Sequence, residues 1–177
     1  MKKTALFAAA IALVFTGAAR AADQPKTIRA EVIFDHPENF TDIKDKDSPT
    51  EKGQQAILDE IRDYLVFEAR NYIPKECKLT ITFTDIGLAG NFEPWRGPPW
   101  DSVRIVKSIY PPSFAFSWKV TDAAGRVVKQ GREKIRDLSF DMRVTIDAND
   151  RLHYEKGVLG DWMGRSLRGV KHALAKN

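Results

Sequence analysis

Histidine is the first side chain to examine for acid–base chemistry, because its charge changes near neutral pH. The chain has three, at His36, His153 and His172. None has a second ligand-type residue at zinc-binding spacing, and no HExxH, CxxC or GxSxG motif, phosphate-binding glycine loop or dinucleotide fingerprint occurs. Any catalytic site would therefore have to be assembled from residues that are distant in the sequence.

A hydrolase is one function that such an assembled site would support. Asp35 and His36 are adjacent, but neighbouring side chains on a strand point to opposite faces, so these two do not form a dyad by themselves. The remaining acid–base candidates are Asp85 and Glu93. We keep an envelope hydrolase with a site near these four residues as an alternative, which a deep pocket holding two of them together would support.

The most acidic local cluster is not arranged as a calcium loop. Such a loop needs ligands at alternate positions and a glycine at the sixth for its sharp turn. Here Pro49 and Thr50 interrupt the series, and lysines alternate with the acids, which are Asp42, Asp45, Asp47 and Glu51. The lone Cys77 opens an apolar segment and is typical of a small buried hydrophobe. We therefore expect no metal and no cofactor.

Residues 91–112 have the composition of a recognition surface, with two of the four tryptophans and five of the nine prolines of the chain. Rigid aromatic side chains supply contact area and a few charges supply orientation. The candidate binding residues are Trp95, Arg96, Trp100, Arg104 and Tyr110. The alternative is a lid, in which both tryptophans pack onto the sheet and an arginine pairs with Asp101 or Glu93. The readiness of indoles to bury favours the lid.

Hydrophobic periodicity predicts the elements that hold this stretch. Alternation indicates strands over 28–34, 78–86, 113–121 and 126–134, a short strand over 103–106 and an edge strand over 140–146. Helical spacing indicates one helix that begins after Ser48 or Thr50 and ends before Pro74, and a second from Leu152 toward the C-terminus. A turn at residues 122–125 would make the flanking strands antiparallel.

This order of elements predicts an α+β fold. We expect residues 22–177 to form a single domain, with a mostly antiparallel or mixed sheet of about four to six strands and two helices packed on one face. A domain of this length buries its own core without disulfides.

Residues 1–21 are typical of a secretory signal peptide, with lysines before an apolar segment and small residues up to a cleavage site after Ala21. The apolar segment is shorter than the ~20 residues that a transmembrane helix needs, so no membrane span is expected after cleavage. We therefore expect a periplasmic protein, with secretion as the alternative.

Cleavage would also lower the net charge. Without Lys2, Lys3 and Arg20, the 28 basic residues fall to 25 against 24 acidic ones, so the net charge falls from +4 to about +1. Because a general attraction to nucleic acid depends on many phosphate contacts, no nucleic-acid partner is expected.

The predicted C-terminal helix keeps a local excess of basic residues, which are Arg151, Lys156, Arg165, Arg168, Lys171 and Lys176. A weak contact with anionic lipid or lipopolysaccharide is therefore a candidate interaction. Cations near a helix C-terminus also complement the helix dipole, and we favour that explanation.

A collinear set of short motifs runs through most of the chain: FDxPxxFTD at 34–42, TDI at 84–86, LAG at 88–90, EPW at 93–95, VR at 103–104, YPP at 110–112, YEK at 154–156 and DW at 161–162. Together they resemble an uncharacterised family of exported proteins from Gram-negative bacteria, known as a domain of unknown function. The resemblance implies a single periplasmic or secreted domain and assigns no activity, cofactor or catalytic residue.

The leading hypothesis is a non-catalytic binding or interaction module of the cell envelope. Its partner, a protein or a glycan, would bind the surface formed by residues 91–112. A purely structural envelope protein is the other alternative beside the hydrolase, and burial of both tryptophans would favour it.

Overall fold

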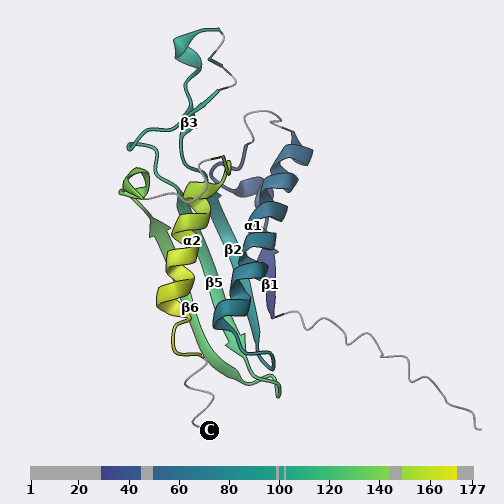
Figure 1. The fold of residues 1–177 in the computed structure, drawn as a ribbon. Helices are drawn as coiled ribbons and strands as arrows, with labels where there is room; N and C mark the ends of the chain where they lie inside the picture. Colours follow the sequence, from purple (N-terminus) through teal and green to yellow (C-terminus); the bar gives the residue numbers. More distant parts are fainter. Residues whose placement is uncertain (1–28, 45–49, 99, 102, 144–148, 171–177) are drawn as a thin grey trace, which may run out of the picture.

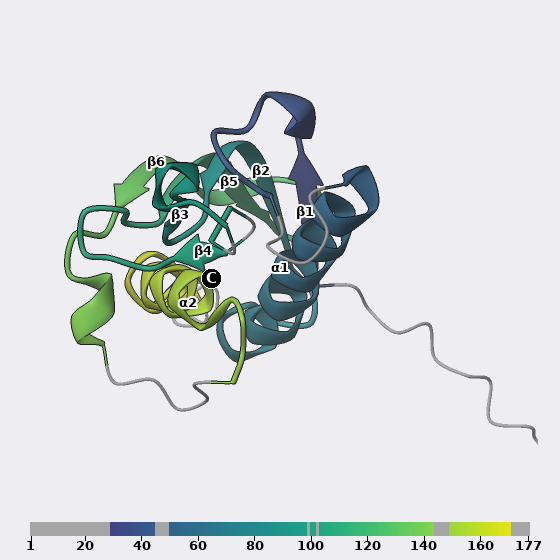
Figure 2. The same cartoon turned by 90° about the horizontal axis from the view of Figure 1, so that it is seen from above.

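The structure is a computed structural model that describes residues 29–44, 50–98, 100–101, 103–143 and 149–170. A four-stranded sheet is covered on one face by two helices (Figures 1 and 2). The strands are β1 (Ala30–Phe34), β2 (Lys78–Gly87), β5 (Ser113–Thr121) and β6 (Val127–Arg136). The helices are α1 (Glu51–Tyr72) and α2 (His153–Ser166). Both helices lie on the same side of the sheet, and no helix of the described residues covers the opposite face, called here the uncovered face.

The order across the sheet is β1-β2-β5-β6, with β1 parallel to β2 and the other two pairs antiparallel. Helix α1 makes the crossover that a parallel pair requires. In the central pair, Phe83 lies opposite Phe116 and Ile81 opposite Trp118. These four side chains are buried. Because side chains alternate along a strand, all four lie on the face that the helices cover.

Helix α1 begins at a cap, since Thr50 Oγ1 accepts a hydrogen bond from Gly53 N at 3.2 Å. It ends at Tyr72, ahead of Pro74, which cannot continue a helix. Helix α2 contains three glycines and has little intrinsic stability of its own. Its packing compensates, because the ring centroid of buried Trp162 lies 4.7 Å from that of Phe116 and 5.9 Å from that of Trp118.

The predicted α+β class, the mixed sheet and the two helices on one face are confirmed. The strands predicted over 78–86, 113–121 and 126–134 correspond to β2, β5 and β6. The described part of the strand predicted over 28–34 is β1, and the short strand over 103–106 is β4 (Arg104–Ile105). The predicted signal peptide lies outside the described residues.

The edge strand predicted over 140–146 is wrong in its described part, where Phe140–Met142 form the 3-10 turn η3. Ser139 N donates to Asp137 Oδ1 at 3.0 Å, and this local side-chain bond favours a turn over a strand ladder. Phe140 is fully buried, with its ring 4.9 Å from that of Tyr154. Residues 144–148 lie outside the described residues.

Gly131 in β6 is expected to be required by close packing. A Cβ at this position would lie 2.8 Å from Nε1 of Trp118, whose ring is held by Trp162 and by a hydrogen bond to Glu133. We expect Gly131→Ala to lower the free energy of unfolding by about 1–3 kcal/mol in urea denaturation.

Gly157→Ala in α2 is the matched control, because the nearest atom to its Cβ would be Arg143 Cδ at an ordinary 3.6 Å. This control should raise stability by up to ~1 kcal/mol through helix propensity. Equal stabilisation by both substitutions would contradict the packing argument.

Candidate functional site

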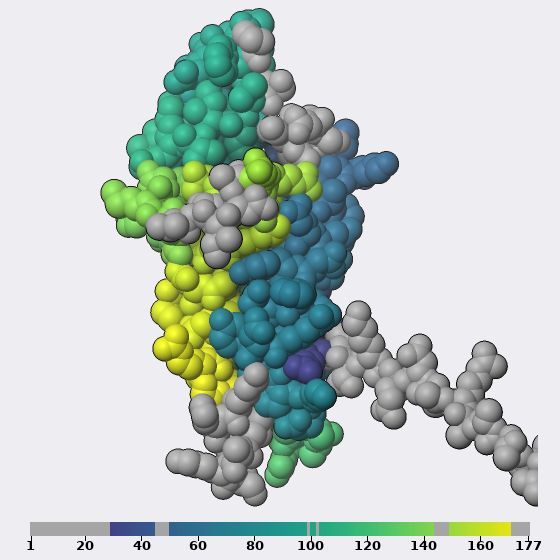
Figure 3. Space-filling view, viewed as in Figure 1, coloured from purple at the N-terminus to yellow at the C-terminus, as the bar shows by residue number. Residues whose placement is uncertain are grey.

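Residues 91–112, called here the 91–112 lobe, project beyond the end of the sheet at which β2 ends and β5 begins (Figures 1 and 3). Strand β3 (Asn91–Phe92) pairs antiparallel with β4, and the 3-10 turn η2 (Pro94–Arg96) follows β3. The chain enters the lobe through Gly90, which has a φ of 81° and whose N–H donates to Tyr110 O at 2.9 Å. A Cβ on Gly90 would lie 2.9 Å from the Ile105 carbonyl oxygen, so this position requires glycine.

Glu93 holds the lobe together from the inside. Its side chain is 2% exposed, and its Oε1 accepts from Lys107 Nζ at 2.5 Å and from Tyr110 Oη at 3.0 Å. Its Oε2 pairs with Arg96 Nε. These donors, Lys107 first, lower the pKa of Glu93 to about 2, although burial opposes the shift. Burial and then the Glu93 carboxylate raise the pKa of Tyr110.

Arg104 ties the lobe to the rest of the fold. Its Nη2 donates to Asp42 Oδ1 and to Lys44 O, both at 2.9 Å, and its Nη1 donates to Gly90 O at 3.0 Å. Its guanidinium also lies 4.8 Å from the centroid of the Phe92 ring. Among the predicted binding residues, Arg104, Tyr110 and Arg96 are therefore engaged by contacts within the protein.

Five large apolar side chains of the lobe are exposed. Trp95 is 71% exposed, Trp100 46% and Ile109 68%, and Val103 and Val106 are exposed as well. The prediction that the tryptophans pack inward as a lid is therefore wrong. Glu93 and its donors occupy the inside of the lobe, which leaves the indoles on the outside. The Arg96–Glu93 pair, which was part of the lid prediction, is confirmed.

A cavity of about 700 Å³ lies at the junction of the lobe and the sheet. Its apolar wall includes Phe92, Pro94 and Ile109, and its polar wall includes Asp85 and Lys134. The volume lies in the range of ligand pockets, roughly 300–1,000 Å³. Ile109, one of the exposed apolar residues of the lobe, also lines this cavity.

The residues of the hydrolase hypothesis do not share one site. His36 Nδ1 lies 3.0 Å from Glu38 Oε1, a contact that raises the pKa of His36, and its Nε2 lies 3.9 Å from Asp35 Oδ1. Asp85 accepts hydrogen bonds from Thr41 N at 2.7 Å and Thr41 Oγ1 at 2.9 Å, and Glu93 turns into the lobe. Of these four residues, the structure brings only Asp35 and His36 together.

Sequence reasoning missed two residues that support the lobe, Lys107 and Glu155. Glu155 is 2% exposed, and its Oε1 accepts from Ala89 N at 2.7 Å, where the chain leaves β2 for the lobe. Burial raises the pKa of Glu155, while the Ala89 hydrogen bond, Arg104 and His153 act in the opposite direction. A signal was present for Glu155, which precedes Leu159 and Trp162 at the spacing of one buried helix face. We find no comparable signal for Lys107.

The basic residues predicted near the C-terminus are partly engaged within the fold. Arg151 pairs with Glu60 at 2.9 Å, and Lys156 pairs with Glu60 at 2.7 Å and with Asp150 at 2.6 Å. Lys171 and Lys176 lie outside the described residues, as do Asp45 and Asp47 of the acidic cluster.

Within the described ranges, no group of three or more histidine, cysteine, aspartate or glutamate side chains is placed to hold a metal ion. Neither α1 nor α2, the helices that the structure describes, combines the length and apolar character needed to cross a bilayer.

The described residues define an α+β protein with one helix-covered sheet face and a projecting aromatic lobe. The chain belongs to the family described as "Protein of unknown function (DUF3016)", whose family model matches residues 29–165. The match spans the sheet and the lobe, and it confirms the resemblance to a domain of unknown function. Searches of the curated proteins and of the solved structures each found no significant match. The function therefore has to be argued from the geometry.

The Glu93 carboxyl should titrate near pH 2 in the folded protein, followed by NMR of its side-chain carboxyl carbon. Because the folded pKa lies below the usual value of 4.5, the ion pairs stabilise the lobe fully above about pH 4.5 and are lost as the pH falls toward 2. Lys107→Met removes the largest cause and should raise the midpoint, whereas Lys75→Met, at an exposed site outside the lobe, should leave it unchanged. If Lys107→Met left the titration midpoint of Glu93 unchanged, this explanation of its low pKa would be wrong.

Glu155 is expected to make stability fall with rising pH. Its folded-state pKa is raised, so its contribution is full below the usual value of 4.5 and declines as the pH rises through the folded pKa. Glu155→Gln keeps an acceptor for Ala89 N and should be more stable than the wild type at pH 7, with the difference vanishing in acid. Urea denaturation across this range measures the effect.

Glu155→Ala is the control, because it leaves the Ala89 N–H without its acceptor and should be about 1–3 kcal/mol less stable than Glu155→Gln at every pH. If Glu155→Gln were less stable than the wild type at pH 7, ionisation of Glu155 would not be the destabilising factor.

Proposed function

We propose that the protein is a non-catalytic binding module of the cell envelope and that the outer surface of the 91–112 lobe binds a protein partner. One observation carries this proposal: Trp95, Trp100 and Ile109 are exposed on a segment that Glu93 and Arg104 brace from the inside. Clustered exposed apolar side chains mark interaction sites on soluble proteins. A braced surface also loses little conformational entropy when it binds.

The aliphatic neighbours of the indoles favour a protein over a glycan. A sugar ring stacks on flat aromatic faces, whereas Val103, Val106 and Ile109 match the apolar side chains of a polypeptide. The cavity of about 700 Å³, which Ile109 helps to line, has room for an anchoring side chain of the partner.

The envelope location rests on the signal-peptide pattern of residues 1–21, which lie outside the described residues. It remains part of the proposal. In the periplasm or outside the cell, the partner would be an envelope protein or another exported protein.

The two alternatives have less support from the geometry. A hydrolase would need two of its proposed residues in one pocket, yet Asp85 alone among them lines the cavity beneath the lobe. A purely structural role was tied to burial of both tryptophans, and both are exposed.

The proposal is tested by placing a photo-cross-linking amino acid at the exposed Pro98, between the two tryptophans, in cells that make the protein, and then measuring the Kd for the purified cross-linked partner. If the indoles are binding hot spots, each worth at least about 2 kcal/mol, Trp95→Ala and Trp100→Ala should each raise the Kd about 30-fold or more. The matched control is Phe67→Ala, an aromatic residue that is 60% exposed on α1. It should leave the Kd unchanged.

Three results would overturn a protein-binding lobe. The first is equal cross-linking from position 67, and the second is an unchanged Kd in both tryptophan variants. The third is a signal on a glycan array that depends on Trp95 and Trp100, which would reassign the lobe to a sugar partner.

A further inference from the structure

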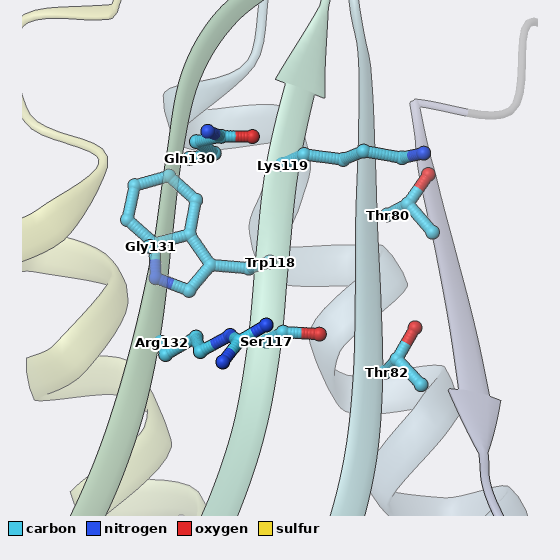
Figure 4. A pocket seen from close by; sticks show the side chains of 8 residues that line it. All are labelled: Thr80, Thr82, Ser117, Trp118, Lys119, Gln130, Gly131 and Arg132. Carbon is cyan, nitrogen blue, oxygen red and sulfur yellow. The ribbon is translucent and has the colours of Figure 1, made fainter.

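The face of the main sheet opposite the helices carries polar side chains, and they line a second cavity of about 490 Å³ (Figure 4). This cavity lies on the uncovered face and shares no lining residue with the cavity beneath the lobe. The buried partners on the same strands, such as Ile81, Phe83 and Val120, face the helices. The uncovered face is therefore available without disturbing the core.

The polar lining residues form two rows across β2, β5 and β6. The strand register aligns Thr82, Ser117 and Arg132 in one row, and Thr80, Lys119 and Gln130 in the next. The two rows lie about 7 Å apart, since each residue of a strand advances ~3.4 Å. Figure 4 shows Lys119 extending across β2 toward Thr80, and Arg132 directed toward Ser117. We call these six side chains the open-face cluster.

Every member of the open-face cluster is a hydrogen-bond donor, and none is an acid. Within the described part of the chain, none of these six side chains has an ion pair or side-chain hydrogen bond to another protein group. Glu31 lies opposite Thr80 in the strand register, and it forms an ion pair with Lys78 at 2.9 Å. The donors are therefore available to an external acceptor.

The side chains that follow the open-face cluster on the same side of β6 are also positively charged. Lys134 and Arg136 continue the uncovered side of β6 beyond Arg132, and neither has an ion pair among the described residues. Asp85, the acid that lines the neighbouring cavity, accepts two hydrogen bonds from Thr41. The β5–β6 half of the uncovered face thus has a local excess of positive charge that attracts an anion.

We propose that the open-face cluster is a binding site for a soluble phosphorylated sugar. Arg132 would hold the phosphate beside Ser117, and Lys119, the hydroxyls of Thr80 and Thr82 and the Gln130 amide would bond to the rest of the molecule.

The chemistry of the cluster matches this ligand in charge, hydrogen bonding and size. Two cations balance a phosphate monoester, which carries about −1.5 to −2 at pH 7. Arg132 also presents the planar fork of donors that suits phosphate oxygens. Hydroxyl and amide groups both donate and accept, as sugar hydroxyls require. The volume of about 490 Å³ suits a molecule of this size.

The test uses glucose 6-phosphate, glucose and inorganic phosphate as probes in NMR titrations of the full-length protein at low and at physiological salt. Glucose 6-phosphate should give saturable shifts at the six cluster residues, glucose should give none, and inorganic phosphate should bind more weakly. Arg132→Gln and Lys119→Gln should each weaken binding at least about tenfold. Lys75→Gln, which removes the same charge from an exposed position outside the sheet, should change the Kd less than twofold.

Several outcomes would overturn the assignment. Equal affinity for inorganic phosphate and glucose 6-phosphate would reduce it to a simple anion site. Shifts spread over all exposed lysines, or an equal effect of Lys75→Gln, would indicate general electrostatic attraction. The absence of saturable shifts at millimolar glucose 6-phosphate, together with binding to vesicles of anionic phospholipid or to an acidic peptide, would assign the face to that ligand instead. None of these outcomes bears on the lobe, whose Trp95 and Trp100 lie outside the cluster.

Discussion

The fold is governed by the fact that helices cover only one face of the sheet. Strand β2 shows the consequence, since Leu79, Ile81 and Phe83 are buried against the helices while the threonines between them face away. Phe116 also lies on the covered face, and Trp162 of α2 packs against its ring. Burial of apolar area drives this packing and holds the glycine-containing helix α2 in place. With the core satisfied on one side, the uncovered face and the lobe are left for contacts with other molecules.

Two buried glutamates at the base of the lobe show how environment decides the state of the same side chain. Glu93 is surrounded by Lys107, Arg96 and Tyr110, so its desolvation is offset and its pKa falls to about 2. Glu155 has one backbone donor at its Oε1, and its Oε2 has no partner among the described residues, so burial raises its pKa. Glu93 therefore stabilises the lobe as an anion, whereas the surroundings of Glu155 favour its neutral form. Braced by Glu93, the lobe exposes its indoles on a fixed scaffold.

Much of the fold follows from local patterns. Alternation in β2, β5 and β6, the Thr50 cap and the turn with Gly125 at a φ of 78° are all readable from short windows of sequence. The turn at Phe140 was missed because alternation there coincides with a hydrogen bond from Ser139 N to Asp137 that competes with strand formation. The orientation of the tryptophans could not be predicted locally. It depends on Lys107 and Tyr110 returning to Glu93 from the far side of the lobe, which is a tertiary contact.

The two surfaces left uncovered are suited to different forces, and this is the physical reason to assign them separately. The lobe exposes tryptophan, valine and isoleucine, so its binding energy would come mainly from apolar burial, which salt does not screen. The open-face cluster exposes Lys119 and Arg132 among hydroxyls, so its attraction would be mainly electrostatic and weaker at high ionic strength. Apolar contact alone would leave the donors of the cluster unpaired by the ligand, and a phosphate gains little from the apolar faces of the indoles. A single ligand that satisfied both surfaces would have to extend from the tip of the lobe around the end of the sheet, which favours two separate ligands.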